Sequence, residues 1–144
     1  MWVVGRHADP AGPMTTTEVV VLPHDASACS QARRWVADHL DPLGLDPALR
    51  YDVVLCVDEL VSNVVDHTFS EPVVTLTVGE AILVEVDDHN SVPPSVQAPT
   101  LSRPRGRGLQ IVDGLADRWG AAVRDDGGKV VWFSVPVPGP LRVT

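Results

Sequence analysis

The sequence predicts a two-layer α/β sandwich, with helices on one face of a mixed, mostly antiparallel sheet. Two segments, residues 25–40 and 47–68, carry apolar residues at the spacing of amphipathic helices. Two pairs of short apolar segments are each separated by so few residues that an antiparallel hairpin is the natural connection. These pairs are residues 72–79 with 81–88, and residues 121–126 with 129–136, the second joined at a Gly-Gly turn.

The predicted domain covers residues 18–136. Residues 1–17 are rich in Gly, Pro and Thr and are expected to form a flexible leader, within which Met14 is an alternative translation start. A short strand is predicted at 18–23, and residues 137–144 are expected to form a short tail. A chain of 144 residues with 44% apolar content is long enough for one domain with its own core.

Capping residues bound the two predicted helices. Asp25 or Ser27 is placed to cap the first helix, and Pro42 follows its end. The second helix is expected to begin after Asp46, with Pro47 at the first helical position, which favours proline. The apolar face of the first helix consists of Ala28, Ala32, Trp35, Val36 and Leu40.

A proline-rich segment, residues 89–105, follows the strand at 81–88. It holds four of the chain's 13 prolines and has no apolar period. A loop of this length inside a compact domain is usually a functional lid or a disordered segment, and we expect a mobile lid that orders over a ligand. Helical spacing returns at residues 106–120, on Leu109, Val112, Leu115 and Ala116.

The charge balance disfavours a nucleic-acid partner. The chain has 11 Lys and Arg against 19 Asp and Glu, which gives a net charge of −8 and a pI near 4.9. Nucleic acid therefore faces a repulsive field unless the few arginines gather on one surface. A basic protein surface is the favoured macromolecular partner.

The cysteines and the hydropathy pattern indicate a cytoplasmic protein. Cys29 and Cys56 lie in apolar surroundings without metal-ligand spacing, so buried free thiols are expected. No apolar run approaches the 18 residues that a membrane span needs, and the first residues contain no signal-peptide core.

The second predicted helix carries polar residues in a valine-rich run, "DELVSNVVDH". Glu59 and Asn63 lie one turn apart on the side opposite the apolar stripe, together with Ser62 and Asp66. A polar stripe is also what an ordinary surface helix shows, and that alternative stays open. Asn is nevertheless a poor helix former for a purely solvated face. The apolar stripe consists of Val53, Val57, Leu60, Val61 and Val64.

Two further features lie on either side of the proline-rich segment. Asp87 and Asp88 end the strand before it, which by itself is ordinary turn chemistry. The sequence "RGRGL", 105–109, begins the helix after it, where glycines permit close approach of a ligand and the helix N-terminus favours an anion such as phosphate. A loop with a glycine hinge explains this motif equally well when it is taken alone.

The order of these three segments is similar to a known family. "DELVSNVVDH", "VEVDDHN" and "GRGLQIVDGLADRWG" resemble the N, G1 and G2 boxes of the histidine-kinase-like ATPase superfamily, which has the Bergerat ATP-binding fold. The resemblance covers roughly residues 18–136 and is closest to the single-domain anti-sigma-factor serine kinases. It implies ATP and Mg²⁺ as cofactors, with a sigma factor and an anti-anti-sigma protein as partners.

The resemblance also implies roles for individual residues. Glu59 corresponds to the general base that takes a proton from the target hydroxyl or water, and Asn63 to the residue that coordinates Mg²⁺. Asp88 corresponds to the acceptor of a hydrogen bond from the adenine amino group. Gly106 and Gly108 are expected to bring backbone amides to the phosphates. The other implied nucleotide-binding residues of this segment are Arg105, Arg107 and Leu109.

The chain departs from the family pattern in the G1 box, where Asn90 and Val92 replace two glycines. A β-branched residue adopts a left-handed backbone only at a cost, so the purine end of the pocket is expected to differ. Two functions therefore follow from the resemblance. One is a serine/threonine kinase that phosphorylates a sigma antagonist and binds a sigma factor, with a homodimer possible. The alternative is a partner-binding switch that uses ATP only as a structural ligand or not at all.

Overall fold

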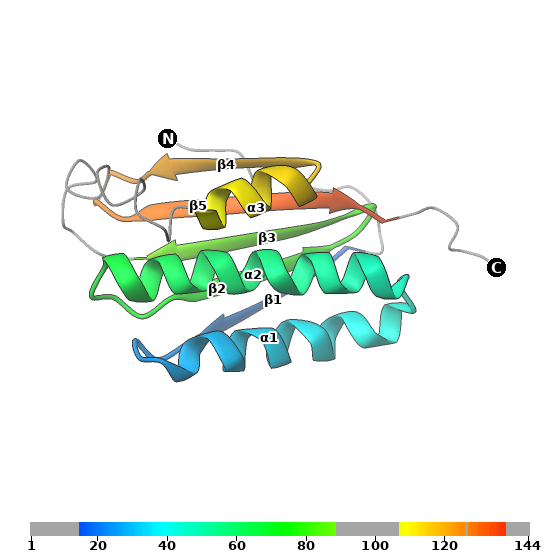
Figure 1. Ribbon diagram of the computed structural model, residues 1–144, viewed down its shortest axis with the longest axis horizontal. Coiled ribbons are helices and arrows are strands. Elements are labelled where there is room, and N and C mark those ends of the chain that lie inside the picture. Colours follow the sequence, from blue (N-terminus) through cyan, green and yellow to red (C-terminus); the bar gives the residue numbers. More distant parts are fainter. Residues whose placement is uncertain (1–14, 89–106, 126, 138–144) are drawn as a thin grey trace.

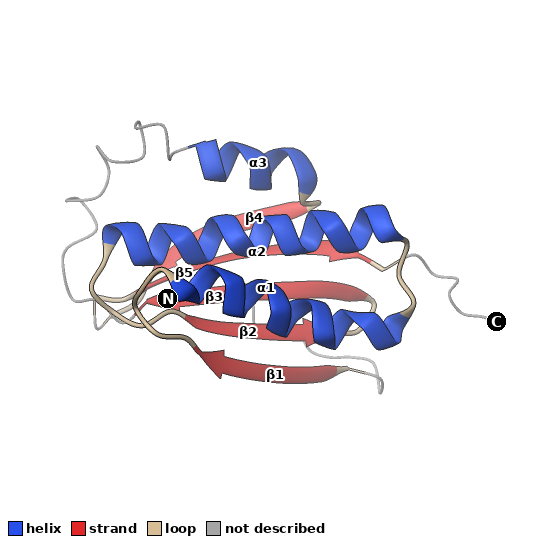
Figure 2. Ribbon diagram, turned by 60° about the horizontal axis from the view of Figure 1, so that its bottom comes forward, coloured by secondary structure: helices blue, strands red, loops and turns tan. Residues whose placement is uncertain are grey.

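The fold is a two-layer α/β sandwich (Figure 1), as the sequence predicts. The computed structural model describes residues 15–88, 107–125 and 127–137. One layer is a five-stranded sheet and the other contains three α-helices, all on the same face of the sheet (Figure 2). Every strand pairing in the described part of the chain is antiparallel, so the expectation of a partly mixed sheet is wrong.

The strand order in the sheet is β1-β2-β3-β5-β4, which places β3 at its centre. Both predicted hairpins are confirmed, because β2 pairs with β3 and β4 pairs with β5. Gly127, in the turn between β4 and β5, has a φ of 93°, a conformation that glycine adopts without strain. The strands are β1 (Thr16–Val21), β2 (Val73–Val78), β3 (Ala81–Asp88), β4 (Arg118–Val123) and β5 (Lys129–Pro136).

The first strand begins earlier than predicted. β1 starts at Thr16, and Thr16 and Thr17 pair with Val78 and Thr77 of β2. Two residues assigned to the leader are therefore part of the sheet. The segment 89–105, for which we expected a lid, lies outside the described residues.

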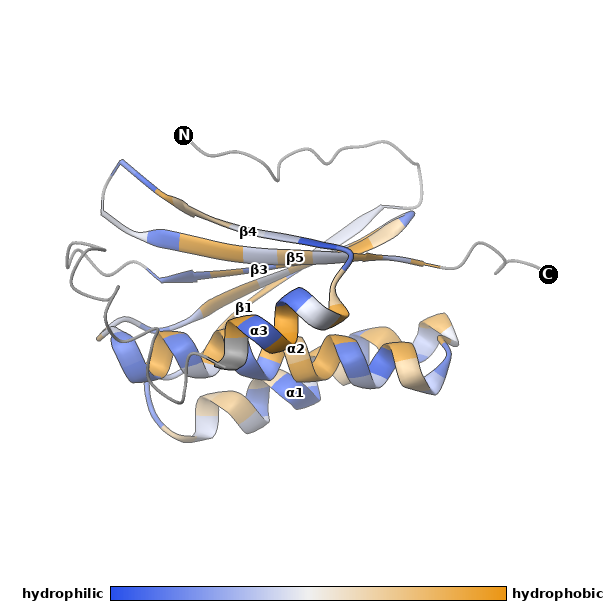
Figure 3. Cartoon of the chain, turned by 45° about the horizontal axis from the view of Figure 1, so that its top comes forward, coloured by the Kyte–Doolittle hydropathy of each residue, from blue (hydrophilic) through white to orange (hydrophobic). Residues whose placement is uncertain are grey.

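Three α-helices and a short 3₁₀ helix form the second layer. α2 lies between α1 and α3 and contacts both of them (Figure 2). The hydrophobic parts of the helices and of the sheet meet between the two layers (Figure 3). The helices are α1 (Ser27–Leu40), the 3₁₀ helix η2 (Asp41–Leu43), α2 (Pro47–His67) and α3 (Arg107–Leu115).

Two aspartates stabilise the starts of α1 and α2. The Asp46 carboxylate accepts the backbone N–H of Ala48 at 3.1 Å, so it caps α2 as predicted. Before α1, the Asp25 carboxylate accepts the backbone N–H of Ser27 at 2.8 Å and also its hydroxyl proton. These two hydrogen bonds lower the pKa of Asp25. The N-cap position of α1 is Ala26, so neither residue considered as a cap occupies it, and Ser27 is the first residue of the helix.

α3 is shorter than the sequence predicts. It ends at Leu115, and residues 118–120 belong to β4 rather than to a helix. The Trp132 indole of β5 lies over Gly120, where an added Cβ would come within 3.0 Å of the ring. Gly120 therefore fits a strand position beneath a large cross-strand ring, which a helical apolar period cannot reveal. Leu115, expected on the apolar face, is exposed.

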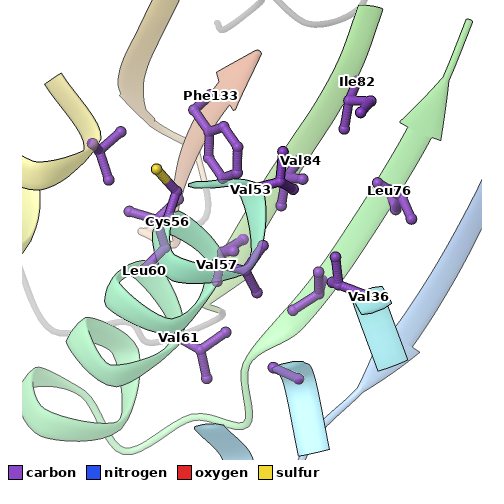
Figure 4. Close-up of a cluster of buried hydrophobic side chains, with 14 of the residues drawn as sticks. Val36, Val53, Cys56, Val57, Leu60, Val61, Leu76, Ile82, Val84 and Phe133 are labelled. Carbon is purple, nitrogen blue, oxygen red and sulfur yellow. The ribbon is translucent and has the colours of Figure 1, made fainter. Parts of the chain in front are cut away.

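The core lies between α2 and the centre of the sheet (Figure 4). The predicted apolar stripe of α2 is confirmed, because all five of its residues are buried. Cys56 joins this stripe and is buried, whereas Cys29 is only half-buried, and both are free thiols. Burial of this apolar surface is the main favourable contribution to folding. The largest fully buried side chains include Leu22, Leu40, Leu60, Leu76, Ile82 and Phe133.

Candidate functional site

Three sequence-predicted segments meet at one end of the molecule. The C-terminal end of α2, the end of β3 and the beginning of α3 all lie at the left of Figure 1. The three segments are far apart in the sequence, and the antiparallel sheet with its crossing helices brings them together. Residues of α2, α3 and β3 can therefore contribute to one site at this end.

Glu59 and Asn63 point toward the α3 side of α2. Arg33 of α1 forms an ion pair with Asp58 at 2.6 Å, which fixes the side of α2 that faces α1. At about 100° per residue, Glu59 lies about 100° and Asn63 about 140° around the helix from Asp58. Since α2 lies between α1 and α3, both side chains are on the side of α3. Both are half-buried, unlike Asp66, which is exposed.

Two neighbours of Glu59 in α2 have buried or hydrogen-bonded side chains. Ser62 donates its hydroxyl proton to the backbone carbonyl of Glu59 at 3.1 Å, so this serine binds its own helix. Burial raises the pKa of the neighbouring Cys56 thiol to about 12, and the charges of Asp52 and Glu59 add to that effect.

Asp88 is a buried carboxylate at the end of β3. Its side chain is only 3% exposed, and it faces the helices because it alternates in phase with the buried Ile82, Val84 and Val86. One of its oxygens, Oδ1, accepts the backbone N–H of Lys129 at 3.3 Å. Carboxylates are rarely buried unless they are hydrogen-bonded, and the backbone N–H of Lys129 supplies one such bond to Asp88.

The beginning of α3 lies at the same end. Arg107 and Gly108 form the first helical residues, so their backbone N–H groups belong to the helix N-terminus, where an anion is favoured. Leu109 is half-buried and packs against the core, which gives it a structural role. Arg105 and Gly106 lie outside the described residues.

Sequence reasoning missed two residues near Asp88. Lys129 lies directly opposite Asp88 in the pairing of β3 with β5, and Arg124 forms an ion pair with Asp87. Both come from the β4–β5 hairpin, about 40 residues away along the chain. The hairpin itself was predictable, but nothing local in the sequence shows that β5 pairs with β3.

The donors that could hold a metal ion are few. Among the described residues, no group of three or more His, Cys, Asp or Glu side chains could bind a metal. Asn63 offers one amide oxygen. This suits Mg²⁺, which usually takes one or two oxygens from the protein and the rest from phosphates and water.

The chain matches one protein-family model, the histidine kinase-like ATPase domain, over residues 22–135. It belongs to this family. The match contains all three site segments and most of both layers, and begins just after β1. Membership confirms the resemblance read from the three boxes, and it implies binding of ATP.

Structural comparison agrees with the family assignment. The chain is similar to the crystal structure of the RsbU and RsbW domains of Rv1364c from Mycobacterium tuberculosis, with a TM-score of 0.68 and 18% sequence identity. The similarity covers 90% of this chain but only 34% of that chain. At this identity it establishes the shared fold. No curated protein is significantly similar in sequence.

The helices that the structure describes also bear on membrane association. Within residues 15–88, 107–125 and 127–137, no helix combines the length and the hydropathy needed to cross a membrane.

Proposed function

We propose that this histidine kinase-like ATPase domain is an Mg·ATP-dependent serine/threonine kinase of the anti-sigma type. In this proposal it phosphorylates an anti-anti-sigma partner and also binds a sigma factor. The observation that carries the proposal is the placement of Glu59 and Asn63 on the α3 side of α2, at the end where the buried Asp88 terminates β3.

Each residue has one task in the proposed reaction. Asp88 accepts a hydrogen bond from the adenine amino group. Asn63, one turn from Glu59, offers its amide oxygen to Mg²⁺, which neutralises charge on the phosphates when it is bound. Glu59 accepts the proton of the target serine or threonine hydroxyl as that oxygen attacks the γ-phosphorus. The bond from the γ-phosphorus to the bridging oxygen breaks, and ADP leaves with its electron pair. The backbone N–H groups at the start of α3 favour the negative phosphates.

The three-dimensional arrangement supports this division of labour. A general base and a metal ligand must approach the γ-phosphate from one side, and a spacing of four residues places them on one helix face. The buried stripe anchors α2 from Val53 to Val64, so both side chains extend from a rigid part of the helix. Rigid support is what a site needs to hold reacting groups in position.

A second function is favoured by one specific observation. Asn90 and Val92, two and four residues after Asp88, stand where the family pattern has glycines. This departure is consistent with a partner-binding switch that uses ATP only as a structural ligand or no longer binds ATP. Nucleotide binding without transfer of phosphate to any partner would favour this second function.

Phosphoryl transfer by a Glu59→Gln variant tests the proposed reaction. The glutamine keeps the size and polarity of the side chain but cannot accept the proton. We expect transfer of label from γ-labelled ATP to the partner protein to fall by about 10²- to 10⁴-fold, while ATP affinity changes little.

Asp58→Asn is the matched control for this experiment. It removes a carboxylate from the adjacent position on the α1 side of the same helix, where Asp58 pairs with Arg33. Its rate of transfer should stay near that of the wild type. Normal transfer by Glu59→Gln, or equal losses in both variants, would remove Glu59 from the role of base.

A further inference from the structure

The β4–β5 hairpin holds the end of β3 from both faces of the sheet. On the face that carries the helices, the backbone N–H of Lys129 donates to the Asp88 carboxylate at 3.3 Å. On the opposite face, Arg124 donates through Nη2 to Oδ1 of Asp87. The two aspartates are consecutive in β3, so their side chains lie on opposite faces. The hairpin therefore contacts both residues that end the strand.

The ion pair between Arg124 and Asp87 is largely shielded from water. The Arg124 side chain is 24% exposed and the Asp87 side chain 14% exposed. Two ion pairs elsewhere, Arg33–Asp58 and Arg50–Asp41, each include an arginine that is at least 40% exposed. Water screens a shielded pair less than an exposed one, so this pair constrains the backbone more strongly.

The backbone around Arg124 is itself fixed by the turn. The N–H of Arg124 donates to the carbonyl of Gly128 at 2.7 Å, and the N–H of Gly127 donates to the carbonyl of Arg124 at 3.0 Å. The guanidinium therefore extends from an ordered position. It lies on the face without helices, where it cannot reach a ligand bound between the helices and the sheet.

We propose that Arg124 is a positioning residue for recognition of the purine base. By fixing Asp87, it fixes the backbone of the next residue and so orients the Asp88 carboxylate toward the 6-amino group of adenine. This inference rests on the proposed function, because it assigns Asp88 to the base. It adds a residue that lies on the opposite face of the sheet and in a different hairpin from the residues of the site.

Base discrimination is the readout that separates positioning from a general structural role. The probes are ATP and purine riboside 5′-triphosphate, which carries hydrogen in place of the 6-amino group and cannot donate to Asp88. We expect the wild type to prefer ATP by about tenfold or more, since one buried hydrogen bond to a charged group is involved. In Arg124→Met the preference should fall to about threefold or less, with Arg124→Lys restoring part of it.

Arg118→Met is the matched control. Arg118 is exposed and is the first residue of β4, across from Ser134, whereas Arg124 follows the last residue of that strand. Its removal should leave the preference for ATP unchanged. Asp87→Asn removes the same ion pair from the other side. If Arg124→Met does not fold, the preference of Asp87→Asn for ATP is measured instead, and the same reduction is expected.

The outcomes distinguish this inference from the proposed function. Equal loss of affinity for both nucleotides in Arg124→Met, with the preference intact, would overturn the positioning role and leave ATP binding standing. A wild type that binds both nucleotides equally would show that Asp88 does not recognise the base. It would overturn this inference and the role proposed for Asp88, and it would leave the proposed kinase reaction at Glu59 and Asn63 standing. A wild type that binds neither nucleotide would overturn the proposed function itself.

Discussion

Glu59 and Asp58 are adjacent carboxylates on α2 with different surroundings. Asp58 pairs with Arg33 on the α1 side, while Glu59 lies on the α3 side beside the proposed site. Helical periodicity predicts this separation directly, because it depends only on positions within one element. The grouping of Glu59 with Asn63 could therefore be predicted from the sequence.

The orientation of Asp88 could be predicted from the sequence, but its contacts could not. Its phase in β3 follows from alternation with the buried valines, which the sequence shows. Its hydrogen bond to Lys129 and the adjacent ion pair of Arg124 depend on pairing between β3 and β5. Such contacts join residues about 40 positions apart, and no local pattern encodes them.

The buried thiol of Cys56 makes stability sensitive to high pH. Burial raises its pKa from 9.0 to about 12. Above pH 9 the unfolded thiol loses its proton while the folded one keeps it, so the free energy of unfolding falls as pH rises. We expect a loss of about 1 kcal/mol from this group between pH 8 and 10.

Urea unfolding of the wild type and of Cys56→Ala at both pH values measures this contribution. The variant is less stable overall because it leaves a cavity, so the comparison uses the change with pH rather than the absolute stability. The variant should lose less stability than the wild type over this interval. Equal losses in the two proteins would contradict the assignment.

At the scale of elements, the sequence predicts α2 and both hairpins well and α3 poorly. α2 has a capping aspartate, an N-terminal proline and a continuous apolar stripe, so its local signals agree with its packing. The end of α3 was misplaced because Gly120 and its neighbours were grouped with the helix. Their place in β4 is set by pairing with β5 and by the Trp132 ring, which are tertiary contacts.

The cap of α2 gives a prediction at this scale. Asp46→Ala removes the carboxylate that accepts the N–H of Ala48, and we expect a loss of about 1 kcal/mol in the free energy of unfolding. Asp46→Asn keeps an acceptor oxygen, so its free energy of unfolding should fall much less. Denaturant unfolding of the three proteins compares them, and an equal loss in both variants would argue against capping as the cause.

At the scale of the whole molecule, the two layers follow from the sequence but the strand order does not. Predicted helices and hairpins already require helices to cover a sheet. The position of β3 beside β5, and of β1 at the edge, is non-local. This order is what places the β4–β5 hairpin next to the proposed site.

The net charge of −8 leads to a prediction about partner binding. If the partner is a sigma factor with a basic surface, opposite fields speed encounter and salt screens them. We expect the dissociation constant for the sigma factor to rise by about tenfold between 50 and 500 mM salt. Fluorescence anisotropy with a labelled sigma factor measures this, and an unchanged dissociation constant would leave the charge as a determinant of solubility alone.

We propose that this histidine kinase-like ATPase domain binds Mg·ATP at the end where α2, α3 and β3 lie together. Isothermal titration of ATP into the wild type and Asn63→Ala, with Mg²⁺ and with EDTA, tests it most directly. We expect one site in the wild type, with ATP affinity at least about tenfold weaker in EDTA or after removal of the Asn63 amide. Absence of binding to the wild type, or binding to Asn63→Ala with unchanged affinity and Mg²⁺ dependence, would contradict it.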